Sequence, residues 1–133
     1  MKAVPFDPET DAAPIPFDRR HLDTALDLKR RGLKWRPHVG CFVWDSEEVI
    51  QAPSPFPLRV YFILSVPRFV DIFGTVDHAA VKLVWLPTWH QGRLAAASLG
   101  VGQKRIEGLF SPDSPASPGE ELLGLYRLIA QAL

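Results

Sequence analysis

The sequence predicts an α+β fold in which four or five helices pack around a small antiparallel sheet of three or four strands. Apolar residues with helical spacing and helix-capping signals occur near the N-terminus and throughout the second half. Short runs of β-branched and aromatic residues, separated by turn residues, occupy the part between. The 133 residues, 47% of them hydrophobic, suffice for one core, so we expect a single domain over 1–133.

The first 17 residues are expected to form an extended, proline-rich arm on the surface. Prolines exclude a helix here and remove backbone donors from any sheet, and the arm contains Pro5, Pro8, Pro14 and Pro16. Three apolar side chains are expected to anchor it to the core: Phe6, Ile15 and Phe17.

The segment from Asp18 to Arg31 has the apolar spacing of a helix, with Leu22 and Ala25 on the inner face. Gly32 follows, at the position where a residue in the left-handed region commonly ends a helix. The sequence therefore predicts the first helix over 18–31.

Two β-rich runs, Val39–Trp44 and Val49–Ala52, flank the polar segment Asp45–Glu48, and this arrangement predicts a β-hairpin. Prolines over 53–57 then end the pairing. The next run, Arg59–Val66, is apolar on both faces, so we expect it to be the central strand of the sheet, covered on both sides.

Proline and glycine bracket a short helix predicted from Pro67 to Phe73, which ends at Gly74. Thr75 is then expected to cap a helix over Val76–Leu86. The apolar run Val81–Leu86 is also typical of a strand, but the spacing of the longer segment favours the helix.

Capping boxes predict the last two helices. One begins at Thr88 and Gln91 and stops at Gly100; the other begins at Ser117–Glu120 and reaches the C-terminus. The stretch between these helices is expected to be mostly loop, with a short strand at Arg105–Phe110. The last helix has an apolar stripe made of Leu122, Leu125, Tyr126, Ile129 and Leu133.

Composition limits the compartment and the partners. The single Cys41 cannot form an intramolecular disulfide or a cysteine-rich metal site. The N-terminal residues are acidic where a signal peptide needs an apolar stretch, and no charge-free run exceeds 10 residues. We therefore expect a cytoplasmic protein that does not contact membranes.

The charges are unevenly distributed along a chain whose net charge is zero. Residues 18–36 carry seven cations and three aspartates, whereas residues 1–17 and 37–133 each have a net charge of −2. Cations around Trp35, over 29–36, are of the kind that bind single-stranded nucleic acid. Cations in the last turn of a helix also complement its dipole, so nucleic-acid binding is the third hypothesis for the function.

The start of the fourth predicted helix carries the candidate ligand site. Backbone N–H groups there can hold an anion, with Arg93 one turn along and His90 as a hydrogen-bond donor or acid–base group. Trp89 lies beside them, and Arg36 and His38 are expected to converge from the segment before the first strand. A small anionic ligand would suit these residues, although capping and packing also explain them without a ligand.

The other reactive side chains are expected to be structural. The four histidines lack metal-ligand spacing, so we expect neither a metal nor another cofactor. In a regular strand Cys41 and His38 point to opposite faces, which indicates a buried cysteine without a base. Glu47 and Glu48 fall, with Asp45, in a turn expected to be exposed. The chain has no P-loop, Rossmann glycine fingerprint or Gly-x-Ser-x-Gly sequence.

Two short segments resemble Nudix hydrolases. Leu83–Pro87 is similar to the exit segment of that family, and Val39–Ile50 is similar to its opening hairpin. The family's magnesium-binding loop and helix have no counterpart between Ile50 and Val60, so the resemblance implies no site in this chain.

These features lead to one main hypothesis, a non-enzymatic binding or interaction domain that forms a homodimer. The number of large apolar residues in so short a chain favours the dimer, with the stripe of the last helix and one sheet face as its surfaces. The alternative is a small hydrolase or transferase acting on a phosphorylated compound through His90, Arg93, Arg36 and His38.

Overall fold

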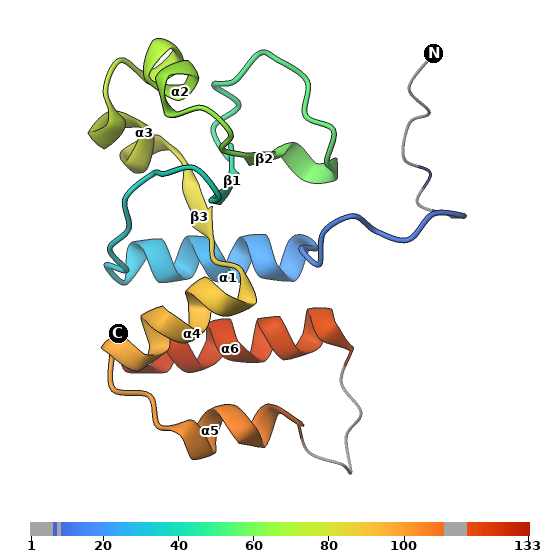
Figure 1. Cartoon of the computed structure of the whole chain (residues 1–133), viewed down its shortest axis with the longest axis vertical. Helices are drawn as coiled ribbons and strands as arrows, with labels where there is room; N and C mark the ends of the chain where they lie inside the picture. Colours follow the sequence, from blue (N-terminus) through green and yellow to red (C-terminus); the bar gives the residue numbers. More distant parts are fainter. Residues whose placement is uncertain (1–6, 8, 111–116) are drawn as a thin grey trace.

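The computed structural model describes residue 7, residues 9–110 and residues 117–133, and its elements confirm the α+β class (Figure 1). In these residues the helices are α1 (Arg19–Arg30), α2 (Val66–Phe73), α3 (Val76–Lys82), α4 (Trp89–Ser98), α5 (Gln103–Glu107) and α6 (Pro118–Ala132). The strands are β1 (Phe42–Trp44), β2 (Val60–Phe62) and β3 (Val84–Leu86). Two 3-10 turns, η1 (Pro57–Arg59) and η2 (Gly108–Phe110), complete the elements.

The three strands form one antiparallel sheet in the order β2-β1-β3. Residue Val43 of the central strand lies opposite Tyr61 on one side and Trp85 on the other. The expectation that Arg59–Val66 would form the central strand was therefore wrong, because β2 is an edge strand. Its two faces are both covered, as the apolar pattern predicted.

The predicted hairpin was also wrong, because the chain after β1 leaves the sheet. The carboxylate of Asp45 is fully buried and accepts hydrogen bonds from the amides of Val49 (3.0 Å) and Ile50 (2.8 Å). These amides bond a side chain in place of a neighbouring strand. The Arg59 guanidinium also donates to Asp45, at 2.6 Å, and residues 49–52 form no strand.

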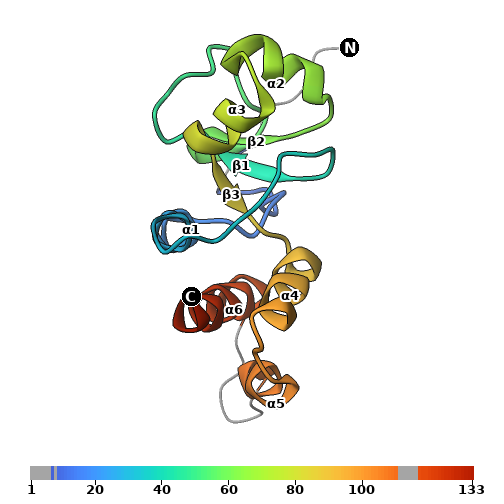
Figure 2. The same ribbon diagram turned by 90° about the vertical axis from the view of Figure 1, so that its left-hand side faces the viewer.

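Helices cover both faces of the sheet (Figures 1 and 2). α2 and α3 lie on one side, and α1 lies on the other, with α6 and α4 beyond it. On the α1 side, Val60 and Leu86 pack against Leu22 and Tyr126. A second cluster on the other side contains Val43, Tyr61, Ile63, Phe73 and Ala79.

The first helix confirms its prediction to within a residue at each end. Asp18 caps it, and His21 completes the capping box by accepting from the Asp18 amide at 3.1 Å. The buried His21 ring also donates from Nε2 to the carbonyl of Gly119 (2.7 Å), which joins the starts of α1 and α6. Gly32 adopts a φ of 94°, as expected for a residue that ends a helix.

The helix predicted over Val76–Leu86 is correct only to Lys82, since Val84–Leu86 is strand β3. The Lys29 ammonium of α1 donates to the carbonyls of Val81 and Leu83, the latter at 3.0 Å. These bonds satisfy carbonyls that the end of a helix leaves without an intrahelical partner. Because the donor lies more than fifty residues away in the sequence, local periodicity could not reveal it.

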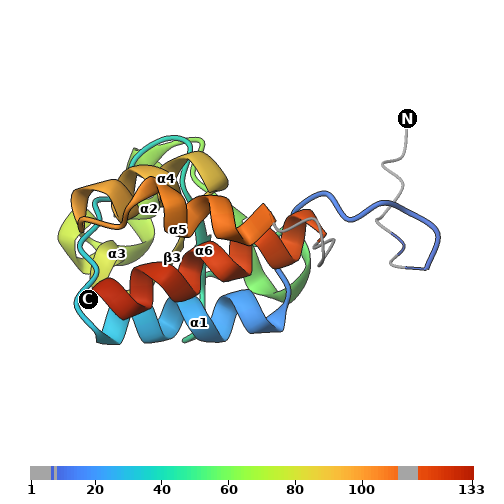
Figure 3. The ribbon, with the colours of Figure 1, turned by 90° about the horizontal axis from the view of Figure 1, so that it is seen from below.

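The remaining helices divide into confirmed and corrected elements. α2, α4 and α6 begin within a residue of their predicted positions, and both Thr88 and Ser117 cap as expected. The strand predicted at Arg105–Phe110 was wrong, because α5 and η2 occupy this stretch. Seen from below the sheet, α4 and α6 lie next to each other, with α1 flanking α6 (Figure 3).

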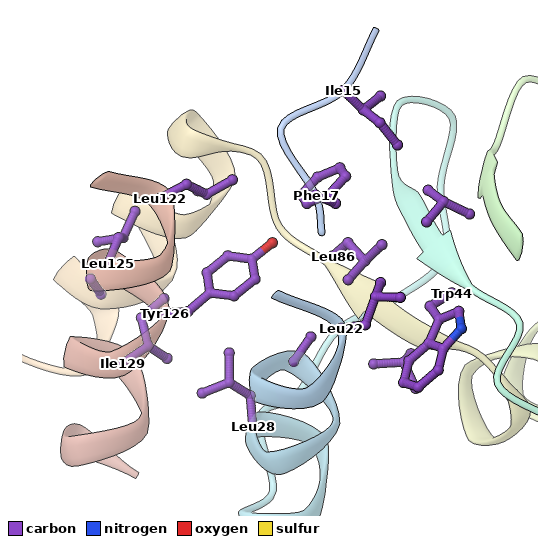
Figure 4. Close-up of a cluster of buried hydrophobic side chains, with 14 of the residues drawn as sticks. Ile15, Phe17, Leu22, Leu28, Trp44, Leu86, Leu122, Leu125, Tyr126 and Ile129 are labelled. Carbon is purple, nitrogen blue, oxygen red and sulfur yellow. The ribbon is translucent and has the colours of Figure 1, made fainter. Parts of the chain in front are cut away.

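The arm is anchored as expected at Ile15 and Phe17, which are both buried; the third expected anchor, Phe6, lies outside the described residues. Figure 4 shows Phe17 nearer than Ile15 to Leu86 and to Tyr126, whose ring extends from α6 into the core. The Tyr126 hydroxyl donates to the carbonyl of Pro87 at 2.5 Å. This bond fixes the corner between β3 and α4.

Candidate ligand-binding pockets

The five residues predicted to form one site do not line a common pocket. Trp89 lies in one pocket, His90 and Arg93 in a second, and His38 in a third. Arg36 is exposed and lines none of these three. Successive residues of a helix are about 100° apart, so the neighbours Trp89 and His90 face different surroundings.

The pocket at His90, here the His90 pocket, is an open depression of about 310 Å³ between α4 and α5. His90 and Arg93 are both exposed in it. The Arg93 guanidinium donates to the side-chain oxygen of Gln103 at 3.0 Å. This bond joins α4 to α5 and occupies one of the Arg93 donors that were predicted to bind an anion.

The pocket that contains His38 is the largest of these three pockets, with a volume of about 570 Å³, and is called the Trp85 pocket. It lies between the segment after α1 and the side of α4. Its apolar walls come from Leu33, Trp85, Leu94, Ala95, Leu99 and Leu133. Polar groups come from Lys34, His38, Gln91 and Ser98, next to Gly32. None of the described residues that line it carries a carboxylate side chain.

Lys34 and His38 give the Trp85 pocket a basic rim, and both are exposed. The Nδ1 of His38 lies 2.8 Å from the carbonyl of Val39. Because a carbonyl only accepts, Nδ1 is the donor in this contact, and Nε2 has no part in it. An apolar wall with cationic groups at its edge suits an organic anion.

Trp85 is held in place by a stacked partner. The rings of Trp35 and Trp85 are nearly parallel, at 7°, with centroids 6.0 Å apart. The indole nitrogen of Trp85 is buried and finds no acceptor among the described residues. Stacking therefore orients this wall, because no hydrogen bond from the indole does so.

Trp89 belongs to an aromatic pocket of about 310 Å³, here the Trp89 pocket. Four rings line it, from the arm, β1, α4 and η2: Phe17, Phe42, Trp89 and Phe110. Trp89 and Phe110 meet at 74° with centroids 5.4 Å apart, and Phe17 and Phe42 meet at 60° with the same separation. Among the described residues of its lining, only Glu121 carries a charge.

The cysteine and the carboxylates of the β1 region have structural surroundings. Cys41 is buried, and this burial raises the pKa of its thiol, which disfavours the reactive thiolate. The His38 ring bonds the Val39 carbonyl, as described above. Glu47 and Glu48 are exposed as expected, whereas the prediction of an exposed Asp45 was wrong. Within the described residues, no group of three or more His, Cys, Asp or Glu could hold a metal ion.

The basic segment 29–36 is partly committed to contacts within the chain. Burial lowers the pKa of Lys29, whose ammonium bonds two carbonyls. Arg31 bonds the Asp27 carboxylate at 2.8 Å, and Trp35 stacks on Trp85. This leaves fewer groups for phosphates than the sequence indicates, and nucleic-acid binding stays a prediction.

The surfaces predicted for a homodimer are covered within one chain. Four residues of the α6 stripe are fully or almost fully buried against α1 and α4: Leu122, Leu125, Tyr126 and Ile129. Both faces of the sheet are covered by helices as well. The homodimer stays a prediction, and these two surfaces are not free to form its interface.

Sequence reasoning missed most of the residues that line the Trp85 and Trp89 pockets. Leu94 and Leu99 appear in the sequence as ordinary helical positions. Phe17, Phe110 and Glu121 come from three distant segments, and no local spacing joins them. Only the tertiary packing of α4 against α6 and of the arm against β1 brings such residues together.

Comparison with known proteins yields no relative: no family model matches the chain, and no curated protein or solved structure is significantly similar to it. The described part of the chain contains no helix that is both long and apolar enough to cross a membrane. The pockets themselves are therefore the basis for a functional hypothesis.

Proposed function

We propose that this protein is a non-enzymatic binding domain that takes a small organic anion with an apolar body in the Trp85 pocket. One observation carries the proposal. About 570 Å³ of largely apolar pocket has the Lys34 ammonium and the His38 imidazole at its edge and no carboxylate side chain among its described lining residues. This volume lies within the usual range for small-molecule sites.

The apolar walls would supply most of the binding free energy. Each 100 Å² of apolar surface removed from water contributes about 2.5 kcal/mol, before the costs of ordering the ligand are subtracted. An exposed cation adds less than about 1 kcal/mol because water screens it. Lys34 and His38 would thus select an anionic group, and the walls would hold the ligand.

Binding is favoured over catalysis by the separation of the candidate catalytic groups. The hydrolase or transferase hypothesis needs His90 and Arg93 close to Arg36 or His38. His90 and Arg93 line the His90 pocket, while His38 lines the Trp85 pocket. A general acid or base must come within hydrogen-bond reach of the reacting atom, and residues in separate pockets do not share one.

The test uses two fluorescent probes that differ mainly in charge. Anilinonaphthalene sulfonate is an apolar organic anion, and N-phenylnaphthylamine is its neutral counterpart. We expect the sulfonate to bind with the lower Kd. Leu94→Glu places a carboxylate in the pocket at a side chain that is 60% exposed, so the fold should persist while affinity for the sulfonate falls about tenfold or more.

Two further variants define the site. Leu64→Glu is the matched control, because Leu64 is 75% exposed and lies outside the Trp85 pocket; it should leave the sulfonate Kd unchanged. Since Leu94 also borders the His90 pocket, Lys34→Gln distinguishes the two and should weaken sulfonate binding severalfold. Equal affinity for both probes, or equal effects of Leu94→Glu and Leu64→Glu in folded proteins, would refute the proposal.

A further inference from the structure

The Trp89 pocket has a composition that the proposed function does not use. It brings together four aromatic rings and a carboxylate from the arm, β1, α4, η2 and α6. Trp89 is half-buried and Phe110 is 50% exposed, so solvent reaches part of each of these two rings. Rings that meet at 60° and 74° form walls of different orientation around a volume of about 310 Å³.

From this arrangement we infer that the Trp89 pocket is a second binding site, selective for a small methylated ammonium cation. The faces of aromatic rings carry partial negative charge and attract a cation that comes within about 6 Å of the ring centre. A quaternary ammonium group suits such a site because its methyl groups make apolar contacts and its hydration shell is weak. Glu121 supplies the opposite charge.

One opposing effect comes from the helix ends that border the pocket. Thr88 and Trp89 lie at the start of α4 and Pro118 at the start of α6, and each helix N-terminus carries about half a positive charge. The cap side chains already accept hydrogen bonds there. Thr88 accepts from the Gln91 amide at 3.2 Å, and Ser117 accepts from the Glu120 amide at 3.3 Å.

The first turn of α6 offsets the remaining positive charge. It contains the carboxylate of Glu121, which lines the pocket. No lysine, arginine or histidine is among the described residues that line the pocket. The balance of charge therefore favours a cation, in contrast with the Trp85 pocket.

The experiment compares choline with 3,3-dimethylbutan-1-ol, which has the same shape and no charge. Ligand-observed NMR titration of the full chain should give a saturable signal for choline and a Kd at least about fivefold weaker for the alcohol. Phe110→Leu removes a half-exposed ring and keeps an apolar side chain. It should weaken choline binding about fivefold and leave the alcohol within twofold.

Glu121→Gln keeps the shape of the side chain and removes its charge, so it should weaken choline binding severalfold. Its neighbour Glu120 does not line the pocket, and Glu120→Gln is the matched control. Equal binding of choline and the alcohol would identify a general apolar pocket and overturn the inference. Absence of saturable choline binding, or unchanged choline affinity in folded Phe110→Leu and Glu121→Gln, would overturn it as well.

The two proposals fail separately. Leu94→Glu should reduce sulfonate binding and leave choline binding unchanged, since Leu94 does not line the Trp89 pocket. Phe110→Leu should do the reverse. If either probe fails to bind, the result for the other pocket is unaffected.

Discussion

The Trp85 and Trp89 pockets take lining residues from the same short segment of the chain, and they differ in charge. Trp85 is the middle residue of β3 and lines a pocket with Lys34 and His38 at its rim, while Trp89, four residues later, begins α4 among aromatic rings and Glu121. The corner between them is fixed by the bond from Tyr126 to Pro87. One short segment thus contributes to two sites with opposite preferences.

This difference shows why nearness in sequence is a poor guide to a shared site. The anionic ligand expected from the sequence was assigned to Trp89, His90 and Arg93 together. In the structure the cationic pocket is bounded instead by Lys34 and His38, which follow α1, and Trp89 faces an acidic pocket. A net charge of zero for the chain conceals this local separation.

The largest effect on both pockets is expected from Tyr126, because it holds the corner that they share. Tyr126→Phe leaves the Pro87 carbonyl without its donor, which should cost about 1–3 kcal/mol in the free energy of unfolding. Tyr126→Ala also removes a fully buried ring and should cost about 3–5 kcal/mol. Urea unfolding measures both, and Tyr126→Phe should weaken sulfonate and choline binding together.

Tyr61→Phe is the matched control for this prediction. The Tyr61 hydroxyl donates to the carbonyl of Ala52 at 2.6 Å, but Ala52 is exposed, so water can replace the lost donor. Stability should fall less than in Tyr126→Phe, and neither probe should bind differently. If Tyr126→Phe weakened the binding of only one of the two probes, the prediction that this corner supports both pockets would be contradicted.

Alkaline pH gives a second measure of the Tyr126 contribution. Burial raises the pKa of this phenol well above its ordinary value of 10.0, so the unfolded chain ionises first. The stabilising contribution is therefore present below about pH 10 and is lost as the pH rises above it. The Tyr126→Phe protein cannot ionise here and should show a shallower loss of stability above pH 10.

The same contrast separates what the sequence could predict from what it could not. α1 was predicted closely from its apolar spacing and from Gly32, and α4 and α6 from the caps Thr88 and Ser117, which act on amides within three residues. The apolar stripe of α6 correctly identified core residues. These signals are local, and a single sequence contains them.

The errors fall where distant groups decide the structure. The buried Asp45 carboxylate turned the chain away from the predicted hairpin, with help from Arg59, fourteen residues on. Lys29 completed the end of α3, and β3 followed where a longer helix was expected. The pockets depend on the same kind of contact, so only fragments of each, such as Trp89 and His38, could be predicted.

Ionic strength should change the ligand Kd of the two pockets differently, with a smaller effect than the Tyr126 substitutions. Lys34 and His38 are exposed, so raising the salt from about 0.05 M to 0.5 M screens their attraction for the sulfonate and should raise its Kd about threefold. Choline depends more on contact with half-buried rings, and its Kd should change less than twofold. The neutral naphthylamine is the control for effects of salt on the fold. Equal salt dependence of both ligands would contradict this assignment.

The smallest expected effect concerns Asp18, which follows Phe17 in the sequence and caps α1. Hydrogen bonds from Arg20, with a further contribution from His21, hold the pKa of this carboxyl at about 2, below its ordinary value of 3.8. Its charge therefore stabilises the fold above about pH 4, and the contribution is lost as the pH falls through 2. Because the side chain is 50% exposed, the gain is below about 1 kcal/mol.

Asp18→Asn isolates this charge, since asparagine caps a helix about as well as aspartate. The variant should be slightly less stable than the natural chain at neutral pH, and the difference should vanish near pH 2. Urea unfolding across this pH range measures the difference. A gap that persisted at about pH 2 would contradict the assignment of this difference to the charge of Asp18.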